Sequence, residues 1–189
     1  MKKNVLAALV AGALVTLPAA AAESYSLDAR HTFPSFEVLH LGYSLQRGRF
    51  NKTSGKITLD TAAKKGAVDI TIDAASVDTG LDKLEEHLRG EDFFNVAKHP
   101  TITFKGDKFA FEGDKVKSVA GTLTMLGVAK PVTLTATHFA CADHPMAKKK
   151  ACGGDFVATV KRTDFGMKYA VPAVADEVTL RIQVEAFKD

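Results

Sequence analysis

Apolar and polar residues alternate one by one along most of the chain. In residues 178–185, for example, valine, leucine, isoleucine and valine alternate with threonine, arginine, glutamine and glutamate. A period of two places successive side chains on opposite faces of a β-strand. Threonine suits the outer face, because it is β-branched and its hydroxyl tolerates water. The strands predicted in this way cover residues 35–41, 56–60, 68–73, 101–105, 109–111, 122–125, 132–137, 156–162 and 178–185.

Glycine and charged clusters separate these segments. Residues 106–108 and 112–114 suit tight hairpins, and residues 64–66 mark a further break. Residues 127–131 predict another connection, with Pro131 at the start of the next strand, where no ladder N–H is needed. Eight or nine evenly spaced strands indicate an all-β fold, either a closed antiparallel barrel or a sandwich.

One segment departs from the period of two. Leu81, Leu84 and Leu88 are spaced as on a helix, so residues 82–89 are predicted to be helical. Asp82 followed by Glu85 resembles a capping box, and Gly90 is a suitable stop. The sequence therefore predicts a short helical insertion in a β-fold.

The N-terminal residues have the pattern of a secretory signal. Two lysines precede a short apolar run, and the alanines at 20–22 form a cleavage pattern. We expect cleavage after Ala22, which leaves one domain over residues 23–189 in the periplasm; the alternative is a retained N-terminal anchor. The sequence contains no second long apolar segment, so it predicts no membrane span after the signal. The formal net charge of the whole chain is +3, and without the two lysines it is nearly neutral, so we expect no nucleic-acid partner.

The two cysteines, Cys141 and Cys152, flank a segment with one proline and three consecutive lysines. In an oxidising compartment, paired cysteines normally form a disulfide. The alternative is a metal site, because His138 and His144 lie close to Cys141 in sequence. The disulfide is the preferred interpretation, because a thiolate ligand would have to escape oxidation there.

No strong catalytic motif is present in the sequence. It contains no nucleophile elbow, dinucleotide fingerprint, P-loop or zinc-protease helix, and we predict neither a catalytic residue nor a cofactor. His40 follows two apolar positions of its strand, so it is expected to point inward, where it could bond to a polar head group. Residues 161–167 allow two interpretations. Either Arg162 and Asp164 form a local ion pair and Phe165 closes the end of the barrel, or these residues lie at the rim of a pocket.

Several short stretches stand out when taken together, namely 28–31 (DARH), 40–42 (HLG), 47–50 (RGRF), 87–95 (HLRGEDFFN), 100–104 (PTITF), 121–124 (GTLT), 127–132 (GVAKPV) and 161–167 (KRTDFGM). In their order and spacing they resemble the YceI-like family of periplasmic polyisoprenoid-binding proteins. Small departures are Thr32, where the family commonly has serine, and Asn95, where it commonly has aspartate.

This resemblance implies an extended eight-stranded antiparallel lipocalin-like barrel around an elongated apolar cavity. It also implies a ligand with a long isoprenoid tail, either an isoprenoid quinone or a polyprenyl lipid, held for storage or transport. Alternating strands would supply such a cavity, and burial of the tail would supply the affinity. The residues that we expect to contact the ligand are Phe36, Val38, His40, Leu88, Phe93, Phe94, Phe104, Met125, Arg162, Asp164, Phe165 and Met167.

Two other functions stay open at this level. One is a metal-dependent enzyme that uses His31, His40, His87 or His138. The other is an interaction module whose barrel is solid and whose loops bind a protein of the cell envelope. The sequence also leaves open whether the protein is a homodimer. A long void inside the barrel would favour lipid binding over both alternatives.

Overall fold

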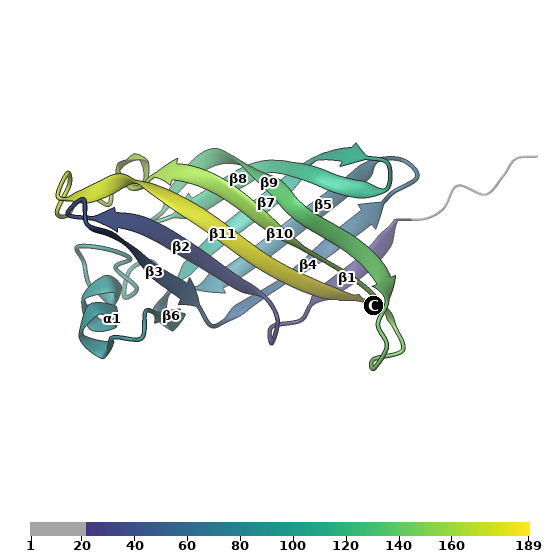
Figure 1. Cartoon of the computed structure of the whole chain (residues 1–189), viewed down its shortest axis with the longest axis horizontal. Helices are drawn as coiled ribbons and strands as arrows, with labels where there is room; N and C mark the ends of the chain where they lie inside the picture. Colours follow the sequence, from purple (N-terminus) through teal and green to yellow (C-terminus); the bar gives the residue numbers. More distant parts are fainter. Residues whose placement is uncertain (1–21) are drawn as a thin grey trace, which may run out of the picture.

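The computed structural model describes residues 22–189 as one antiparallel sheet that closes into an elongated barrel (Figure 1). The predicted signal peptide lies outside the described residues, apart from Ala22. The strands are β1 (Glu23–Leu27), β2 (Phe33–His40), β3 (Ser44–Phe50), β4 (Thr53–Asp60), β5 (Lys65–Asp73), β6 (Val77–Asp78), β7 (Thr101–Glu112), β8 (Lys115–Met125), β9 (Val128–Asp143), β10 (Lys150–Lys161) and β11 (Val174–Lys188).

The predicted eight-stranded antiparallel barrel is confirmed. The ring has the order β1-β4-β5-β7-β8-β9-β10-β11, and β11 pairs with β1 to close it. The strand β1 is short and covers only the end of β11, from Ala186 to Lys188. The rest of β11 pairs with β2, which continues the wall through β3 and β6. Alternation did not reveal β1, β3 or β6, because their residues are mixed in polarity or too few.

The predicted helix α1 (Asp82–Arg89) has the expected bounds and lies at the end of the barrel where β2 turns into β3 (Figure 1). Arg89 fixes it to the wall, because its Nε donates to the carbonyl of Ala75 at 2.8 Å and its Nη2 to that of Val77 at 2.9 Å. The predicted capping box is wrong. Leu81 is the N-cap and makes no side-chain cap, and the Glu85 carboxylate accepts instead from the N–H of Thr79.

The predicted hairpin at residues 106–108 is also wrong. The strand β7 runs through it, and the register against β8 shifts between Gly106 and Lys108, as in a β-bulge. Glycine is needed here because the backbones of β7 and β8 approach each other closely, and not because the chain turns. A Cβ added at Gly121 would lie 2.8 Å from the Cα of Gly106. The hairpin predicted at 112–114 is confirmed by the positive φ of Gly113 between β7 and β8.

The connection predicted at 127–131 is shorter than expected. Leu126 and Gly127, with φ of 54° and 75°, form the turn, and β9 begins at Val128. Pro131 therefore lies inside β9, opposite Thr122 of β8. On the other side, the ladder between β9 and β10 runs only as far as Thr135 opposite Val157, so the missing N–H of proline interrupts no bond there.

The predicted disulfide is confirmed. Cys141 and Cys152 face each other on β9 and β10, and their sulfurs are bonded. The alternative metal site with Cys141 as a ligand is therefore wrong. In the chain-entropy model, closing a loop of this length stabilises the fold by about 3 kcal/mol.

A buried tyrosine and an ion-pair network lie at the end of the barrel opposite α1. The ring of Tyr25 is 1% exposed, and its hydroxyl donates to the carboxylate of Glu23. The same carboxylate pairs with Lys150 at 2.8 Å and with Lys188 at 2.7 Å. Its hydrogen bonds to Lys150, Lys188 and Tyr25 lower the pKa of Glu23 to about 2. These residues join β1, β10 and β11 at this end.

We expect Glu23→Gln to flatten the acid dependence of stability. A carboxylate whose pKa is lowered on folding contributes stability above its unfolded pKa of about 4.5, and that contribution is lost as the pH falls towards about 2. The free energy of urea unfolding, measured at pH 7 and pH 3, should therefore change less in the variant than in the wild type. Glu177→Gln, at an exposed site on β11, is the control. An equal pH dependence in Glu23→Gln and wild type would contradict this role of the network.

Candidate ligand cavity

Two cavities lie along the inside of the barrel and share five lining residues. The outer cavity, on the side of α1, has an empty volume of about 1130 Å³ including the part that opens to solvent. The inner cavity, on the side of Tyr25 and the disulfide, has about 770 Å³ by the same measure. The residues that line both cavities, which we call the junction, are Pro34, Ile70, Phe104, Leu134 and Ile182.

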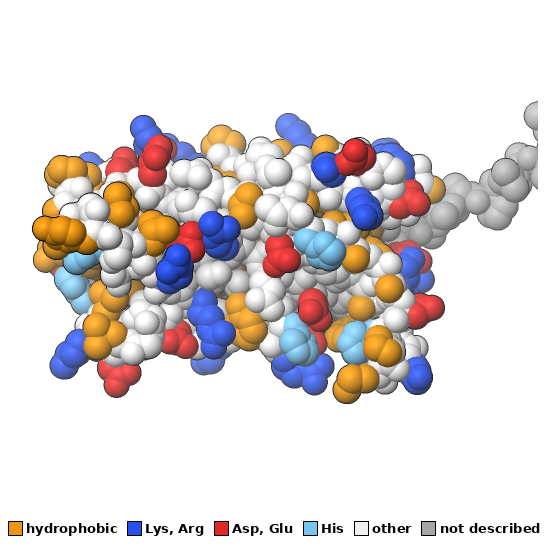
Figure 2. Space-filling model, viewed as in Figure 1, with side chains coloured by type: hydrophobic (Ala, Val, Ile, Leu, Met, Phe, Trp, Pro, Cys, Tyr) orange, Lys and Arg blue, Asp and Glu red, His pale blue; other side chains and the backbone are white. Residues whose placement is uncertain are grey.

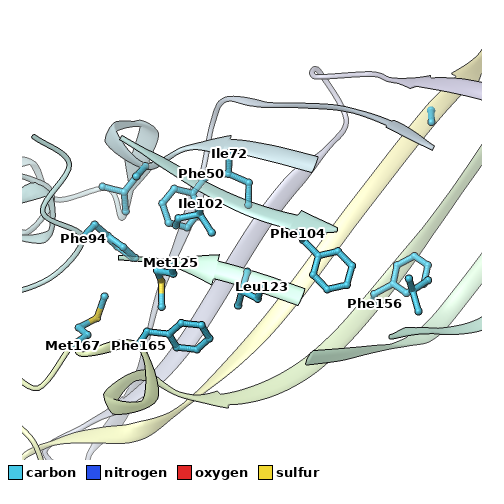
Figure 3. Close-up of a cluster of buried hydrophobic side chains, with 14 of the residues drawn as sticks. Phe50, Ile72, Phe94, Ile102, Phe104, Leu123, Met125, Phe156, Phe165 and Met167 are labelled. Atoms are coloured by element: carbon cyan, nitrogen blue, oxygen red, sulfur yellow. The ribbon is translucent and has the colours of Figure 1, made fainter. Parts of the chain in front are cut away.

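The alternation of the strands makes this interior apolar. On β9, Val132 and Leu134 face the cavities, whereas the intervening Thr133 and Thr135 are exposed. Figure 3 shows how such side chains follow one another along the barrel, from Phe94 and Met125 past Phe104 to Phe156. The interior is therefore a long apolar space rather than a fully packed core.

Arg162 is the one charged residue that lines the outer cavity, among the residues that the structure describes. It is 3% exposed. Its Nε donates to the carbonyl of Ala175 at 2.9 Å and its Nη2 to that of Val174 at 2.9 Å. Its Nη1 donates to the carbonyls of Tyr169 at 2.8 Å and Met167 at 3.4 Å. The guanidinium thus holds the segment between η2 (Arg162–Phe165) and β11 over the cavity.

Within residues 22–189, the hydrogen-bond partners of Arg162 are all backbone carbonyl oxygens, and none is a carboxylate. Burial lowers the pKa of the guanidinium, and the negative charge of Asp176 opposes this effect. Asp176 itself accepts from the N–H of Thr163 at 3.0 Å and from its hydroxyl at 2.9 Å. A guanidinium has five N–H groups, so one N–H on Nη2 has no acceptor among the described residues.

The ion pair that was one interpretation of residues 161–167 does not form. Asp164 is exposed, and Arg162 turns inward to the four carbonyls. Phe165 is 2% exposed and packs in the core beside the outer cavity, without lining it. Only Arg162 and Met167 from this segment line the cavity.

Most of the other residues predicted to contact a ligand also come together at the outer cavity. His40 does not; it is half-buried at the end of β2, opposite Ser44 and Val174. Leu88 is buried in the hydrophobic core and does not line either cavity. The predicted residues that line the outer cavity are Phe36, Val38, Phe93, Phe94, Phe104, Met125, Arg162 and Met167.

The inner cavity was not anticipated residue by residue. Its wall includes Tyr25, Ile57, Val116 and Phe139, which are apolar positions on strands with no signal that sets them apart from packed core. It also includes Thr53, which is 5% exposed and whose Oγ1 has no hydrogen-bond partner among the described residues. A buried hydroxyl without a partner is costly, so this site has an unused polar group.

The comparisons with known proteins agree with this architecture. A family model described as the YceI-like domain matches residues 25–186. The chain belongs to the YceI-like family. A UPF0312 protein of Pseudomonas aeruginosa strain LESB58 is 40% identical over 192 residues, which cover 100% of both chains.

Solved structures of similar proteins have the same fold. The crystal structure of BcnA from Burkholderia cenocepacia is similar, with a TM-score of 0.72 and 28% identity over 84% of this chain and 98% of that one. A polyisoprenoid-binding domain from Saccharophagus degradans has a TM-score of 0.61 and 18% identity, over 88% of this chain and 99% of that one. At that identity the second likeness shows the fold alone.

Proposed function

We propose that this YceI-like protein binds one long isoprenoid lipid non-covalently, with its tail along the two adjoining cavities. The observation that carries the proposal is that both cavities are apolar, lie along the barrel and share lining residues such as Phe104 and Leu134. A slender chain suits a long narrow cavity better than a compact ligand does. Each Å² of apolar surface removed from water contributes about 25 cal/mol, so a tail of several prenyl units needs few polar contacts.

The outer cavity suits the polar end of such a lipid. It is the larger of the two, and Arg162 is the one charged residue of its lining within residues 22–189. The positive charge of Arg162 would attract a quinone carbonyl or a phosphate oxygen. The tail would then extend past Leu134 into the inner cavity. An isoprenoid quinone and a polyprenyl lipid both meet these requirements.

We place this binding in the periplasm, where the protein would store the lipid or carry it between membranes. The Cys141–Cys152 disulfide suits an oxidising compartment. No helix within residues 22–189 is long and apolar enough to cross a membrane. The neighbour described as a polyisoprenoid-binding domain supports the ligand class. The proposal includes no catalytic step.

The protein should carry its ligand through purification. We expect organic extraction of the purified full chain, followed by mass spectrometry, to release about one prenyl lipid per chain. Protein stripped of lipid should take up solanesol, a long polyprenol, when it is supplied from detergent. Protein that holds no lipid and takes up no solanesol would overturn the proposed function.

A further inference from the structure

Exposed large apolar side chains gather at the end of the barrel that holds the outer cavity. Six of the seven within residues 22–189 lie on or beside the elements of this end. Figure 2 shows hydrophobic side chains gathered there. Only Met146 lies at the other end, on the turn between β9 and β10. We call the six the apolar tip, and they are Leu39, Leu41, Tyr43, Leu45, Leu81 and Tyr169.

The turn of the β2–β3 hairpin exposes apolar side chains to water. The side chains of Leu41 and Tyr43 are 52% and 87% exposed. Leu41 also has a φ of 51°, a left-handed conformation that asparagine or glycine adopts at lower cost. Leucine is thus unfavourable here both for its backbone and for its contact with water. Such a residue suggests a partner that covers it.

The apolar tip is continuous with the lining of the outer cavity. The ring of Tyr169 contacts that of Phe93 with centroids 5.4 Å apart, and Phe93 lines the cavity. The N–H of Leu41 donates to the carbonyl of Ala173 at 2.8 Å, which joins the hairpin to the segment held by Arg162. A molecule that leaves the cavity here would meet apolar side chains before it met water.

The composition of the tip suits a lipid surface. Residues 39–45 contain no aspartate, glutamate, lysine or arginine, and residues 168–174 contain only Lys168, whereas the exposed Asp82 follows Leu81. Two of the three segments of the tip thus have one cation and no carboxylate, so they can approach phosphate head groups without repulsion. Leucine and tyrosine are side chains that favour the boundary between head groups and acyl chains.

Two backbone N–H groups near the tip are hydrogen-bonded within the protein, as a region with little water requires. The N–H of Tyr43 donates to the carbonyl of His40 at 3.0 Å, and that of Val174 to the carbonyl of Ala170 at 2.8 Å. A protein partner would have to cover a much wider surface than these six side chains, because a stable protein interface uses about 20–30 residues on each side.

We infer that the apolar tip docks on a phospholipid bilayer, so that a lipid passes between membrane and cavity without crossing water. This inference rests on the proposed function for the identity of the cargo, but not for the docking itself. It assigns Leu41 and Tyr43 to membrane contact and the tip to the face turned towards the bilayer.

Vesicle binding by the full chain tests the inference. The probe is sonicated vesicles of phosphatidylethanolamine and phosphatidylglycerol, and the bound fraction is measured by flotation. The double variant Leu41→Asn and Tyr43→Ser should bind the vesicles at least about tenfold more weakly than the wild type, because two apolar side chains no longer leave water on binding. Its thermal midpoint should not fall, because asparagine tolerates the left-handed conformation. Met146→Ser, at the opposite end, should bind as the wild type does.

A transfer assay separates this inference from the proposed function. The double variant should take up solanesol from detergent normally but from donor vesicles more slowly than the wild type. Normal vesicle binding by the double variant would overturn the docking, and so would an equal loss in Met146→Ser. The docking would also be overturned if the wild type and Met146→Ser formed a concentration-dependent dimer and the double variant did not. The partner of the tip would then be a second copy of the chain. Failure of uptake from detergent by the wild type would count against the proposed function instead.

Discussion

Replacing Leu134 by tryptophan should abolish the binding of long polyprenols while sparing short ones. Leu134 lines both cavities, so the larger indole would close the junction between them. The part of a long tail that normally occupies the inner cavity would then stay in water, at a cost of about 25 cal/mol for each Å². We expect the affinity for solanesol to fall by at least about a hundredfold and that for a short prenol such as farnesol to change little. Titration of lipid-free protein with each ligand from detergent measures the effect.

Thr135→Trp is the matched control, because Thr135 is the next residue of β9 and is exposed. It should bind both ligands as the wild type does. The thermal midpoint of Leu134→Trp should be close to that of the wild type, because the new ring fills empty space rather than displacing packed atoms. If Leu134→Trp bound solanesol with wild-type affinity, the tail would not pass the junction, and the inner cavity would have no part in binding.

Replacing Arg162 by methionine should destabilise the barrel by about 3–5 kcal/mol. Four carbonyl oxygens would lose their donor at a site that is shielded from water, and each buried acceptor without a partner costs about 1–3 kcal/mol before relaxation. The segment from Met167 to Val174 would then lose its attachment over the outer cavity. Urea unfolding followed by circular dichroism measures the change.

Arg181→Met is the control for the loss of an arginine. The Nε of Arg181 donates to Glu37 on the exposed face of β11 and β2, and exposed ion pairs contribute about 0–1 kcal/mol. Arg162→Lys should be intermediate, because one ammonium cannot reach four carbonyls at once. A loss within about 1 kcal/mol for Arg162→Met would show that the loop does not depend on the guanidinium.

The sequence predicted strands well where one face is apolar and the other polar. It failed where backbone geometry decides the structure. The cluster at 106–108 reads as a turn, yet β7 continues through it, because a bulge and the close approach to Gly121 also call for glycine. It also failed for short strands such as β1, whose place is set by its pairing with β4 and β11 rather than by its own pattern.

The sequence predicted only part of the candidate site, because the pattern of a strand does not show what an inward-facing side chain meets. Apolar positions such as Phe36, Phe94 and Met125 could be identified as inward-facing, and the structure places them at the outer cavity. Phe165 has the same character in sequence, yet it lies in packed core. Periodicity tells which side of the wall a residue faces, but not whether another side chain or empty space lies opposite.

The sequence by itself determined an all-β chain with one short helix, the pairing of Cys141 with Cys152, and an apolar inner face, because all three depend on local pattern or on the number of cysteines. Only the tertiary structure decided that the opposing walls leave two adjoining cavities between them. It also decided that Arg162 bonds to the loop above that space instead of to Asp164. The first outcome depends on contacts between strands far apart in the chain, and the second on a loop that folds back over Arg162 from 5 to 13 residues away. A period of two along a strand carries no information on either.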